Sequence, residues 1–348
     1  MPLPGDLSEL AARVSNWGRW GEDDELGCGN LLTSEAARRG AEQVRSGRRV
    51  SLAAELKADG IQVGQPARRY NPLLTVTSLN ERDKFAPGIW EGTDDIVMMS
   101  TCAGTHVDAL CHVSYDDQLY NGVPTSVVTA QYGAAKLGAE KLPQIVTRGV
   151  LLDLPVVKGV AGLDEIDPGY AITADDLDAA ADAAGATIQA GDVVCVRTGE
   201  MRHYRAGDRQ RYAVGQEFKL PGLSVHSIEW MRNHDVAGAF VDSYAYEAFP
   251  PSQPDWSDCL AVHMIQLRDM GLLQGQNWDF EDLSVTCQEE GRGAFLLVAA
   301  PEPLVGAVIG PGRARRHVLI VRWLSSVRCR VARVGRLTPR LSGEQRGW

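Results

Sequence analysis

The 348-residue sequence has no apolar run that approaches the roughly 20 residues needed for a helix to span a bilayer. The N-terminus lacks the basic start and apolar stretch of a secretion signal. Neither a Gly-x-Gly-x-x-Gly motif nor a phosphate-binding loop is present, so no nucleotide cofactor is indicated. These absences predict a cytoplasmic enzyme or binding protein that has no membrane partner.

The sequence also lacks closely spaced cysteine pairs, and it has fewer basic than acidic residues. The seven cysteines form no Cys-x-x-Cys pair, which argues against a zinc ribbon or a thioredoxin-like site and fits free thiols in a reducing compartment. The 35 basic residues are outnumbered by 45 acidic ones, which gives a net charge of −10. An acidic chain of this kind argues against a nucleic-acid partner.

The charge is distributed unevenly along the chain. Residues 311–348 contain ten arginines, no lysine and one acidic residue, Glu344. We therefore predict a single domain over residues 1–310, followed by an arginine-rich tail over 311–348. The tail has three interpretations: a segment that binds an anionic surface, a solvated extension, or translated sequence that has left its ancestral frame. We assign the tail no chemistry.

Helical and strand patterns alternate along residues 1–310, which predicts an α/β protein with a mixed sheet and outer helices. Residues 57–94 are expected to form a long loop with one short strand at 73–76, and 95–100 a buried strand. Helices are predicted at 34–47, capped by Thr33, and at 174–184, 224–234, 260–270 and 281–290. Further strands are predicted at 50–56, 149–154, 192–197, 236–241, 294–299 and 304–309.

The segment from Cys102 to His112 carries the strongest chemical signal. If residues 106–108 are extended, His106 and Asp108 project from the same face, because strand side chains alternate. An imidazole beside a carboxylate suits Zn²⁺ or Mn²⁺. His112 would then stand close to the metal, where a general base is needed. Hydrogen-bonded core histidines would explain the same spacing without a metal.

The segment resembles the signature of the metal-dependent cyclase family, which includes kynurenine formamidases and isatin hydrolases. The family pattern is His-x-Gly-Thr-His-x-Asp-x-x-x-His, and this chain has Cys102 at its first position. Separated motifs in the same order strengthen the resemblance over residues 15–310. These motifs are Trp20–Thr33, Leu119–Gly122, Thr147–Asp153 and Gly191–Gly199.

The resemblance implies a β/β/α fold with a partly closed central sheet, and a divalent metal, Zn or Mn. Its implied metal-binding positions are Cys102, His106, Asp108, His263 and Gln276, where the family has Glu in place of Gln276. Cys102 is alternatively a buried thiol, Gln276 an outer hydrogen-bond partner, and His263 a helix N-terminal histidine facing a carboxylate. The resemblance also implies a homodimer or homotetramer.

Two further groups of residues are candidates for the pocket. Asp242 and Glu247 follow a predicted strand and either orient ligands or are ordinary surface or capping carboxylates. Trp17, Trp20 and Trp90 either form an aromatic wall for a planar substrate or have structural roles.

The implied activity is hydrolysis of a small amide, cyclic amide or lactone. A metal-activated hydroxide would attack the carbonyl while His112 serves as general acid and base. Three alternatives stay open: a non-hydrolytic cyclase or dehydratase of secondary metabolism, a catalytically silent binding relative, and a nucleophile built from Cys102 with His106 or His112. In each case the partner is a small molecule.

Overall fold

The computed structural model describes residues 3–64, 68–82, 88–159, 165–251 and 260–313. Its centre is a closed seven-stranded barrel with the strand order β10-β11-β3-β13-β12-β6-β8. The barrel strands are β3 (His106–Asp108), β6 (Ile145–Asp153), β8 (Val193–Arg197), β10 (Gly238–Val241), β11 (Leu273–Gln276), β12 (Ala294–Pro301) and β13 (Ile309–Arg313). The predicted mixed α/β fold is confirmed, and the sheet closes fully where partial closure was expected.

The barrel strands are apolar on both faces. In β8, Val194 and Val196 pack outward against the helices, whereas Val193 and Cys195 pack into a second cluster with Phe240, Trp278 and Phe295. Strands buried on both sides lose the polar-apolar alternation of a half-exposed strand, which explains the continuous apolar runs in the sequence. The strands β6, β8, β10 and β11 are parallel neighbours, and β3, β12 and β13 pair antiparallel.

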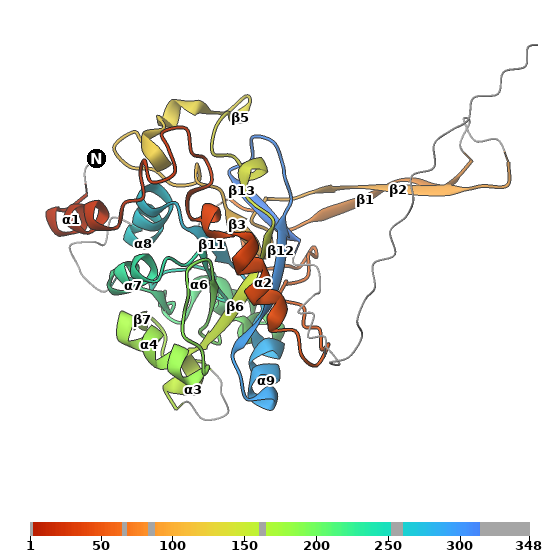
Figure 1. Ribbon diagram of the computed structural model, residues 1–348. Helices are drawn as coiled ribbons and strands as arrows, with labels where there is room; N and C mark the ends of the chain where they lie inside the picture. The colour runs from red at the N-terminus through yellow and green to blue at the C-terminus, as the bar shows by residue number, and fades with distance from the viewer. Residues whose placement is uncertain (1–2, 65–67, 83–87, 160–164, 252–259, 314–348) are drawn as a thin grey trace, which may run out of the picture.

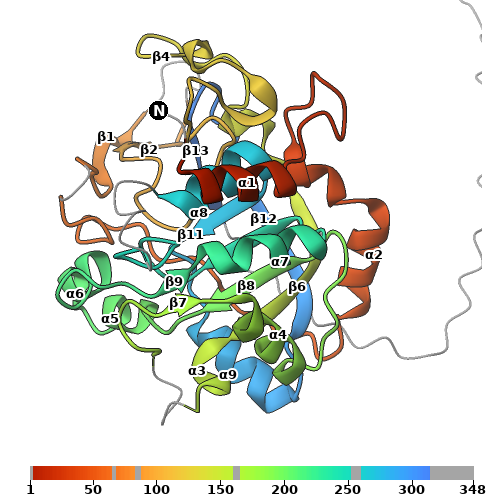
Figure 2. The same cartoon turned by 90° about the vertical axis from the view of Figure 1, so that its left-hand side faces the viewer.

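Helices surround the barrel, with α1, α4 and α7 on the side that faces the viewer in Figure 2. The α-helices are α1 (Gly5–Val14), α2 (Ser34–Glu42), α3 (Leu154–Val157), α4 (Ala174–Ala183), α5 (Met201–Arg205), α6 (Arg209–Val214), α7 (Ile228–Asn233), α8 (Ala261–Met264) and α9 (Glu281–Glu290). A π-helical segment, η8 (Ile265–Met270), continues α8. Short 3-10 turns are η1 (Gly27–Leu31), η2 (Tyr120–Gly122), η3 (Thr125–Val127), η4 (Ala139–Lys141) and η6 (Val225–Ser227). No helix among the described residues is long and apolar enough to span a membrane.

Local signals placed several of these helices correctly. Thr33 accepts a hydrogen bond from the Ala36 amide, and Thr173 and Asp176 form a reciprocal capping box. The α2 helix ends at Glu42, earlier than the predicted Gly47. Ser224 does not cap through its side chain, because its hydroxyl donates to the Ile172 carbonyl. Helix α1 carried no strong start signal and was missed.

The segment before the barrel was the largest error in the predicted elements. Strands β1 (Leu73–Glu81) and β2 (Gly92–Met98) pair only with each other and form a ribbon that projects from the barrel (Figure 1). We call this ribbon the arm. Residues 95–98 are strand as predicted, but they are exposed where burial was expected. Residues 50–56 make only an isolated bridge, between Ala53 and Trp278, and 304–308 form a turn rather than a strand.

Two small two-stranded sheets and the end of strand β13 complete the fold. The pairs are β4 (Val128–Thr129) with β5 (Gly133–Ala134), and β7 (Ala171–Ile172) with β9 (Gly222–Leu223). Strand β13 includes residues 311–313 of the predicted tail and pairs with both β3 and β12. The rest of that tail, 314–348, lies outside the described residues.

Candidate metal centre

The motif strand β3 lies between two antiparallel neighbours in the barrel. His106 is directly opposite Gln276 of β11 and Pro311 of β13, and Asp108 is opposite Gln274 and Ile309. Directly opposed residues have Cβ atoms about 4.5–5.5 Å apart, so this register alone places Gln276 beside the His106–Asp108 pair. Pairing on both sides explains why a strand of only three residues is fully buried.

The motif's Thr105 holds these two strands together at their ends. Its hydroxyl donates to the Asn277 carbonyl at 2.6 Å and accepts from the Ala54 amide at 2.9 Å. Gly275 is required for close packing, because a Cβ there would lie 2.4 Å from both Phe240 Cδ1 and Trp278 Nε1. Phe240 and Trp278 stack with ring centroids 4.4 Å apart. The aromatic stack therefore sets the position of Gln276.

Four of the predicted site residues come together. His106 Nε2 lies 3.6 Å from Asp108 Oδ1, the Gln276 amide nitrogen donates to Asp108 Oδ2 at 2.8 Å, and it lies 3.1 Å from His263 Nε2. All four side chains are at most 6 % exposed. Asp108 Oδ1 has no hydrogen-bond partner. Buried carboxylate oxygens are rarely left unsatisfied, so this oxygen has a free lone pair inside the cluster.

The outer nitrogens of both histidines are held by oxygen acceptors. His106 Nδ1 lies 2.8 Å from the Gly104 carbonyl, and His263 Nδ1 hydrogen bonds to Glu247. Glu247 also accepts from the amides of Val262 and His263 at the start of α8. These partners select the tautomer in which each Nε2 carries the lone pair that binds a metal. Glu247 thus both caps α8 and orients His263.

The protonation of the three histidines follows from their surroundings. Burial lowers the pKa of His106, against the opposing charge of Asp108 and the Gly104 carbonyl. Burial also lowers the pKa of His112, which feels the charges of Asp108 and His263. Burial acts in the same direction on His263, but the hydrogen bond and charge of Glu247 outweigh it and raise its pKa. The lowered pKa favours the neutral form of His112, which is able to accept a proton.

Cys102 lies at the start of the motif and is 3 % exposed. Burial raises the pKa of its thiol, Arg69 lowers it, and the Asp108 charge raises it again. These influences keep the sulfur protonated in the absence of a metal. Its role as a ligand stays a prediction.

The donor set fits a divalent cation such as Zn²⁺ or Mn²⁺. Two imidazole Nε2 atoms and one carboxylate form a three-ligand set of the kind found in catalytic metal sites. Their atoms do not all lie within 4.8 Å of one another, since the Gln276 amide stands between Asp108 and His263. Gln276 can offer only a neutral carbonyl oxygen, after a half-turn of its amide.

A pocket of about 660 Å³ opens onto this cluster. His263 and Gln276 form part of its wall, together with Tyr244 and Arg69. The remaining lining is mostly apolar: Gln210, Ala213, Val214, Phe218, Leu220, Ala245, Phe249 and Leu260. Pockets of this size and character bind small organic molecules.

The predicted tryptophan wall is not the aromatic surface of this pocket. Trp17 donates to the Arg268 carbonyl, and Trp90 is exposed beside the arm. Phe218, Tyr244 and Phe249 supply the aromatic rings instead. No periodic pattern marks these three residues in the sequence, because they come from loops that the fold brings together.

Asp242 is fully buried and is not an ordinary surface carboxylate. It accepts hydrogen bonds from the Thr198 amide and hydroxyl and from the Gly199 amide, so it fixes the loop after β8. Burial and the charge of Glu281 raise its pKa to about 7, against the hydrogen bonds of Thr198 and the charge of Arg197.

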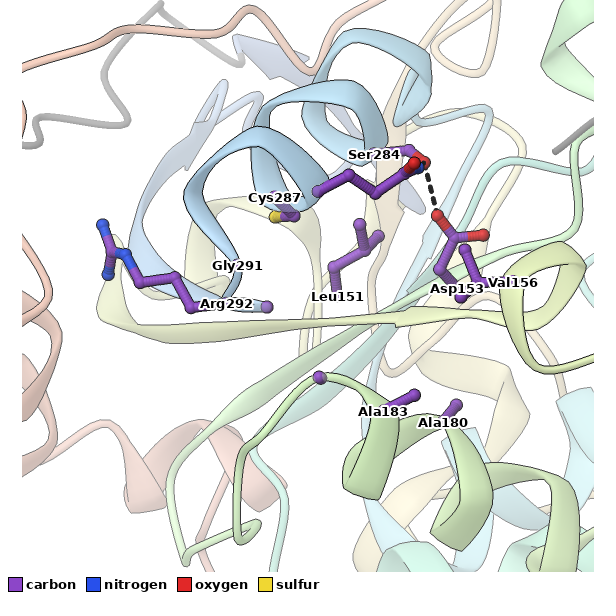
Figure 3. Close-up of a pocket in the computed structure, with 12 residues that line it drawn as sticks. Leu151, Asp153, Val156, Ala180, Ala183, Ser284, Cys287, Gly291 and Arg292 are labelled. Atoms are coloured by element: carbon purple, nitrogen blue, oxygen red, sulfur yellow. Dashed lines mark hydrogen bonds between the residues drawn. The ribbon is translucent and has the colours of Figure 1, made fainter. Parts of the chain in front are cut away.

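A second, smaller pocket of about 190 Å³ lies between α4 and α9 (Figure 3). Ala180 and Ala183 of α4 and Cys287 of α9 face it, and Ser284 hydrogen bonds to Asp153. It contains none of the predicted site residues. Asp153 also pairs with Arg197, so its polar groups serve to connect barrel and helix.

Comparison with known proteins assigns the chain to a family and a fold. The Cyclase family profile matches residues 50–248, which is more than half of the chain. A crystal structure described as a novel cyclase is 30 % identical, has a TM-score of 0.76, and covers 87 % of this chain and 97 % of its own. The chain belongs to the Cyclase family.

Isatin hydrolases share the fold of this Cyclase-family chain at lower identity. One, bound to the product analogue thioisatinate, is 18 % identical with a TM-score of 0.55, covering 82 % of this chain and 96 % of its own. Isatin hydrolase A from Ralstonia solanacearum is 19 % identical with a TM-score of 0.52, covering 76 % and 89 %. No curated protein matches the sequence. The resemblance drawn from the sequence motifs is therefore confirmed at the level of family and fold.

Proposed function

We propose that this Cyclase-family protein is a metal-dependent hydrolase of a small amide, cyclic amide or lactone. The observation that carries the proposal is Asp108 Oδ1, which has no hydrogen bond and lies 3.6 Å from His106 Nε2, in a cluster whose Gln276 and His263 line an apolar pocket. His106, Asp108 and His263 would hold the cation. When bound, it would polarise a carbonyl and lower the pKa of water.

The chain's own side chains supply the remaining steps. His112 is neutral, because burial lowers its pKa, and would take the proton of the attacking water and return it to the leaving nitrogen or oxygen. Glu247 holds His263 in one tautomer and one orientation. Phe218, Tyr244 and Phe249 would bind the ring or acyl part of the substrate and exclude water.

Arg69 suits the product of such a reaction. Hydrolysis of an amide or lactone leaves a carboxylate, and a guanidinium binds carboxylates with paired hydrogen bonds. Arg69 lines the pocket near Tyr244, whose pKa its charge and hydrogen bond lower, against the dominant effect of burial. The isatin hydrolases that share the fold support a cyclic amide as the first substrate to test.

One observation favours a second function, that of a binding protein without catalysis. The Gln276 amide already hydrogen bonds to Asp108 and contacts the His263 lone pair, so the cluster is satisfied in part without a cation. A chain of this second kind would bind a small molecule in the pocket and retain no metal.

The test measures metal content and turnover together. Purified protein reconstituted with Zn²⁺ or Mn²⁺ is screened against formamides, cyclic imides and lactones in ¹⁸O-labelled water. We expect retained metal, turnover and one labelled oxygen in the product, with His106→Ala losing metal and turnover together. His234→Ala, whose ring bonds only to the Trp230 carbonyl, is the matched control.

Three results would contradict the metal-dependent hydrolase. Turnover by a metal-free His106→Ala protein would remove the metal from the mechanism. A product without labelled oxygen would indicate the cyclase or dehydratase instead. Ligand binding with neither metal nor turnover would support the silent relative.

A further inference from the structure

A second group of potential ligands lies outside the candidate metal centre. Glu165, Glu200 and His203 each offer one ligand atom, and these atoms all lie within 4.8 Å of one another. Glu200 directly precedes α5, His203 lies within α5, and Glu165 comes from the chain between α3 and β7. None of the three lines the 660 Å³ pocket. Two separate parts of the chain, the start of α5 and the segment before β7, therefore converge on this point.

One carboxylate oxygen in this cluster has no partner among the described residues. Glu200 is fully buried, and its Oε1 has no hydrogen-bond partner. Glu165 Oε2 and His203 Nε2 form a close ion contact with each other beside it. Buried polar atoms are almost always satisfied in proteins. The unsatisfied Glu200 Oε1, within 4.8 Å of an imidazole nitrogen and a second carboxylate, indicates a ligand bound at this cluster.

Arg211 holds the other side of both carboxylates. Its two terminal nitrogens lie 3.2 Å from Glu200 Oε2 and 3.4 Å from Glu165 Oε1. The outer oxygens are thus oriented by a guanidinium, while the inner oxygens point toward His203. Outer partners that fix a ligating carboxylate in this way are typical of metal sites. One guanidinium balances one carboxylate and leaves the second charge for a cation.

We propose that Glu165, Glu200 and His203 form a structural site for a divalent cation of the zinc or manganese class. One imidazole and two carboxylates are a ligand set that both metals accept. The site connects to the pocket through α6, which lies beside α5 (Figure 2). Gln210, Ala213 and Val214 of α6 line the pocket, and Arg211 of the same helix contacts the two carboxylates. A bound cation would therefore fix one wall of the pocket.

The competing occupant of these lone pairs is a proton. Burial raises the pKa of Glu200 to about 8, although Arg211 opposes it, so a protonated Glu200 within a hydrogen-bonded cluster is the alternative. The two possibilities differ in metal content, and the experiment must count metal at this cluster separately from metal at His106 and Asp108.

The experiment compares metal equivalents in matched variants after dialysis against Zn²⁺ or Mn²⁺ and removal of free metal. We expect His203→Ala and Glu165→Gln each to lose one equivalent relative to the natural chain. Glu217→Gln, a carboxylate that is 78 % exposed and paired with Lys219, should lose none. His106→Ala should retain the equivalent that the double variant His106→Ala/His203→Ala lacks.

Thermal unfolding gives a second readout that does not depend on activity. Added Zn²⁺ or Mn²⁺ should raise the Tm of His106→Ala and of Glu217→Gln in the same background, but not that of His106→Ala/His203→Ala. Equal metal content in the natural chain, His203→Ala and Glu165→Gln, with circular dichroism showing all three folded, would overturn the proposal and assign the cluster to a shared proton.

Discussion

Strand β3 and strand β1 both pair antiparallel, but they differ in length, burial and number of neighbours. β3 has three residues, all buried, and neighbours on both sides. β1 has nine residues, nearly all exposed, and pairs only with β2 in the arm. The contrast shows that the length of a strand does not determine how much it contributes to stability. A strand contributes most when other elements cover both its edges and both its faces, because they remove it from water.

The same contrast separates the apolar side chains of the two regions. Leu74, Leu79 and Met98 of the arm are 65–68 % exposed, whereas Val107 of β3 is 1 % exposed. An isolated two-stranded ribbon is marginal in water. Substitutions should therefore have large effects in the barrel and small effects on the stability of the arm, which four comparisons can test.

The largest effect is expected for Asp108→Asn. The amide keeps the shape but loses the charge that would hold a cation, so metal retention and turnover should both be lost. The metal-free variant should nevertheless be more stable than the natural chain, by about 1 kcal/mol, because an unpaired buried carboxylate oxygen is removed. Metal analysis and urea unfolding of metal-free protein check both parts.

Asp95→Asn is the matched control in the arm, where Asp95 is exposed and opposite Val76. It should leave metal content and stability unchanged. A loss of metal in this control as large as that in Asp108→Asn would break the comparison.

The next effect is expected for Gln276→Glu, which introduces the residue that the family resemblance implies at this position. A second buried carboxylate would lie within 3 Å of Asp108 Oδ2, so metal-free protein should lose about 1–3 kcal/mol of stability. With Zn²⁺ present the extra charge should tighten metal binding, and the order of the two melting temperatures should reverse. Asn80→Asp makes the same charge change in the arm and should show no reversal.

A smaller, pH-dependent effect is expected for Asp242→Asn. The folded pKa of Asp242, about 7, lies above the ordinary value of 3.8, so its contribution to stability is present at low pH and is lost as the pH rises toward 7. The natural chain should exceed the variant in stability most clearly near pH 5, and the difference should shrink by pH 8. Urea unfolding across this range measures it, and a difference that grows with pH would contradict the assignment.

The smallest effect on stability is expected in the arm. Leu74→Thr/Val97→Thr should change the free energy of unfolding by no more than about 0.5 kcal/mol, since both residues are more than half exposed. Val196→Thr in β8 should lower the free energy of unfolding by about 1–3 kcal/mol, because its hydroxyl would be buried.

If the predicted homodimer or homotetramer forms through the arm, light scattering should show smaller particles for the arm variant alone. Unchanged particle size would place the contact elsewhere.

Much of the barrel was predictable from the sequence because its strands are short apolar runs and its helices have caps. Thr173 with Asp176, and Gly271 after η8, marked helix ends that the structure confirms. The register that sets Gln276 opposite His106 could not be predicted from spacing, since it depends on long-range pairing of β11 with β3. Only the family resemblance indicated it.

The arm and the second cluster escaped prediction for different physical reasons. Polar residues interrupt both strands of the arm, as Asn80 and Glu81 do in β1 and Asp94 and Asp95 in β2, and such a sequence is typical of a loop. Neither face of the arm is buried, so its apolar residues show no periodic pattern. Glu200 and His203 are neighbours at the start of α5, but Glu165 comes from a different segment, and only the fold brings it to them. Glu247 was predicted only as one of two options, and its bond to His263 required the structure.

The two ends of the arm meet at its base, so a probe can be attached to the arm without changing the barrel. The Ser100 amide donates to the Tyr70 carbonyl at 3.1 Å, and the Tyr70 amide donates to Ser100 Oγ at 2.8 Å. A fluorophore attached at Leu79 would therefore report from a stalk rooted within a few residues of Arg69 and the pocket, without interrupting any strand of the barrel.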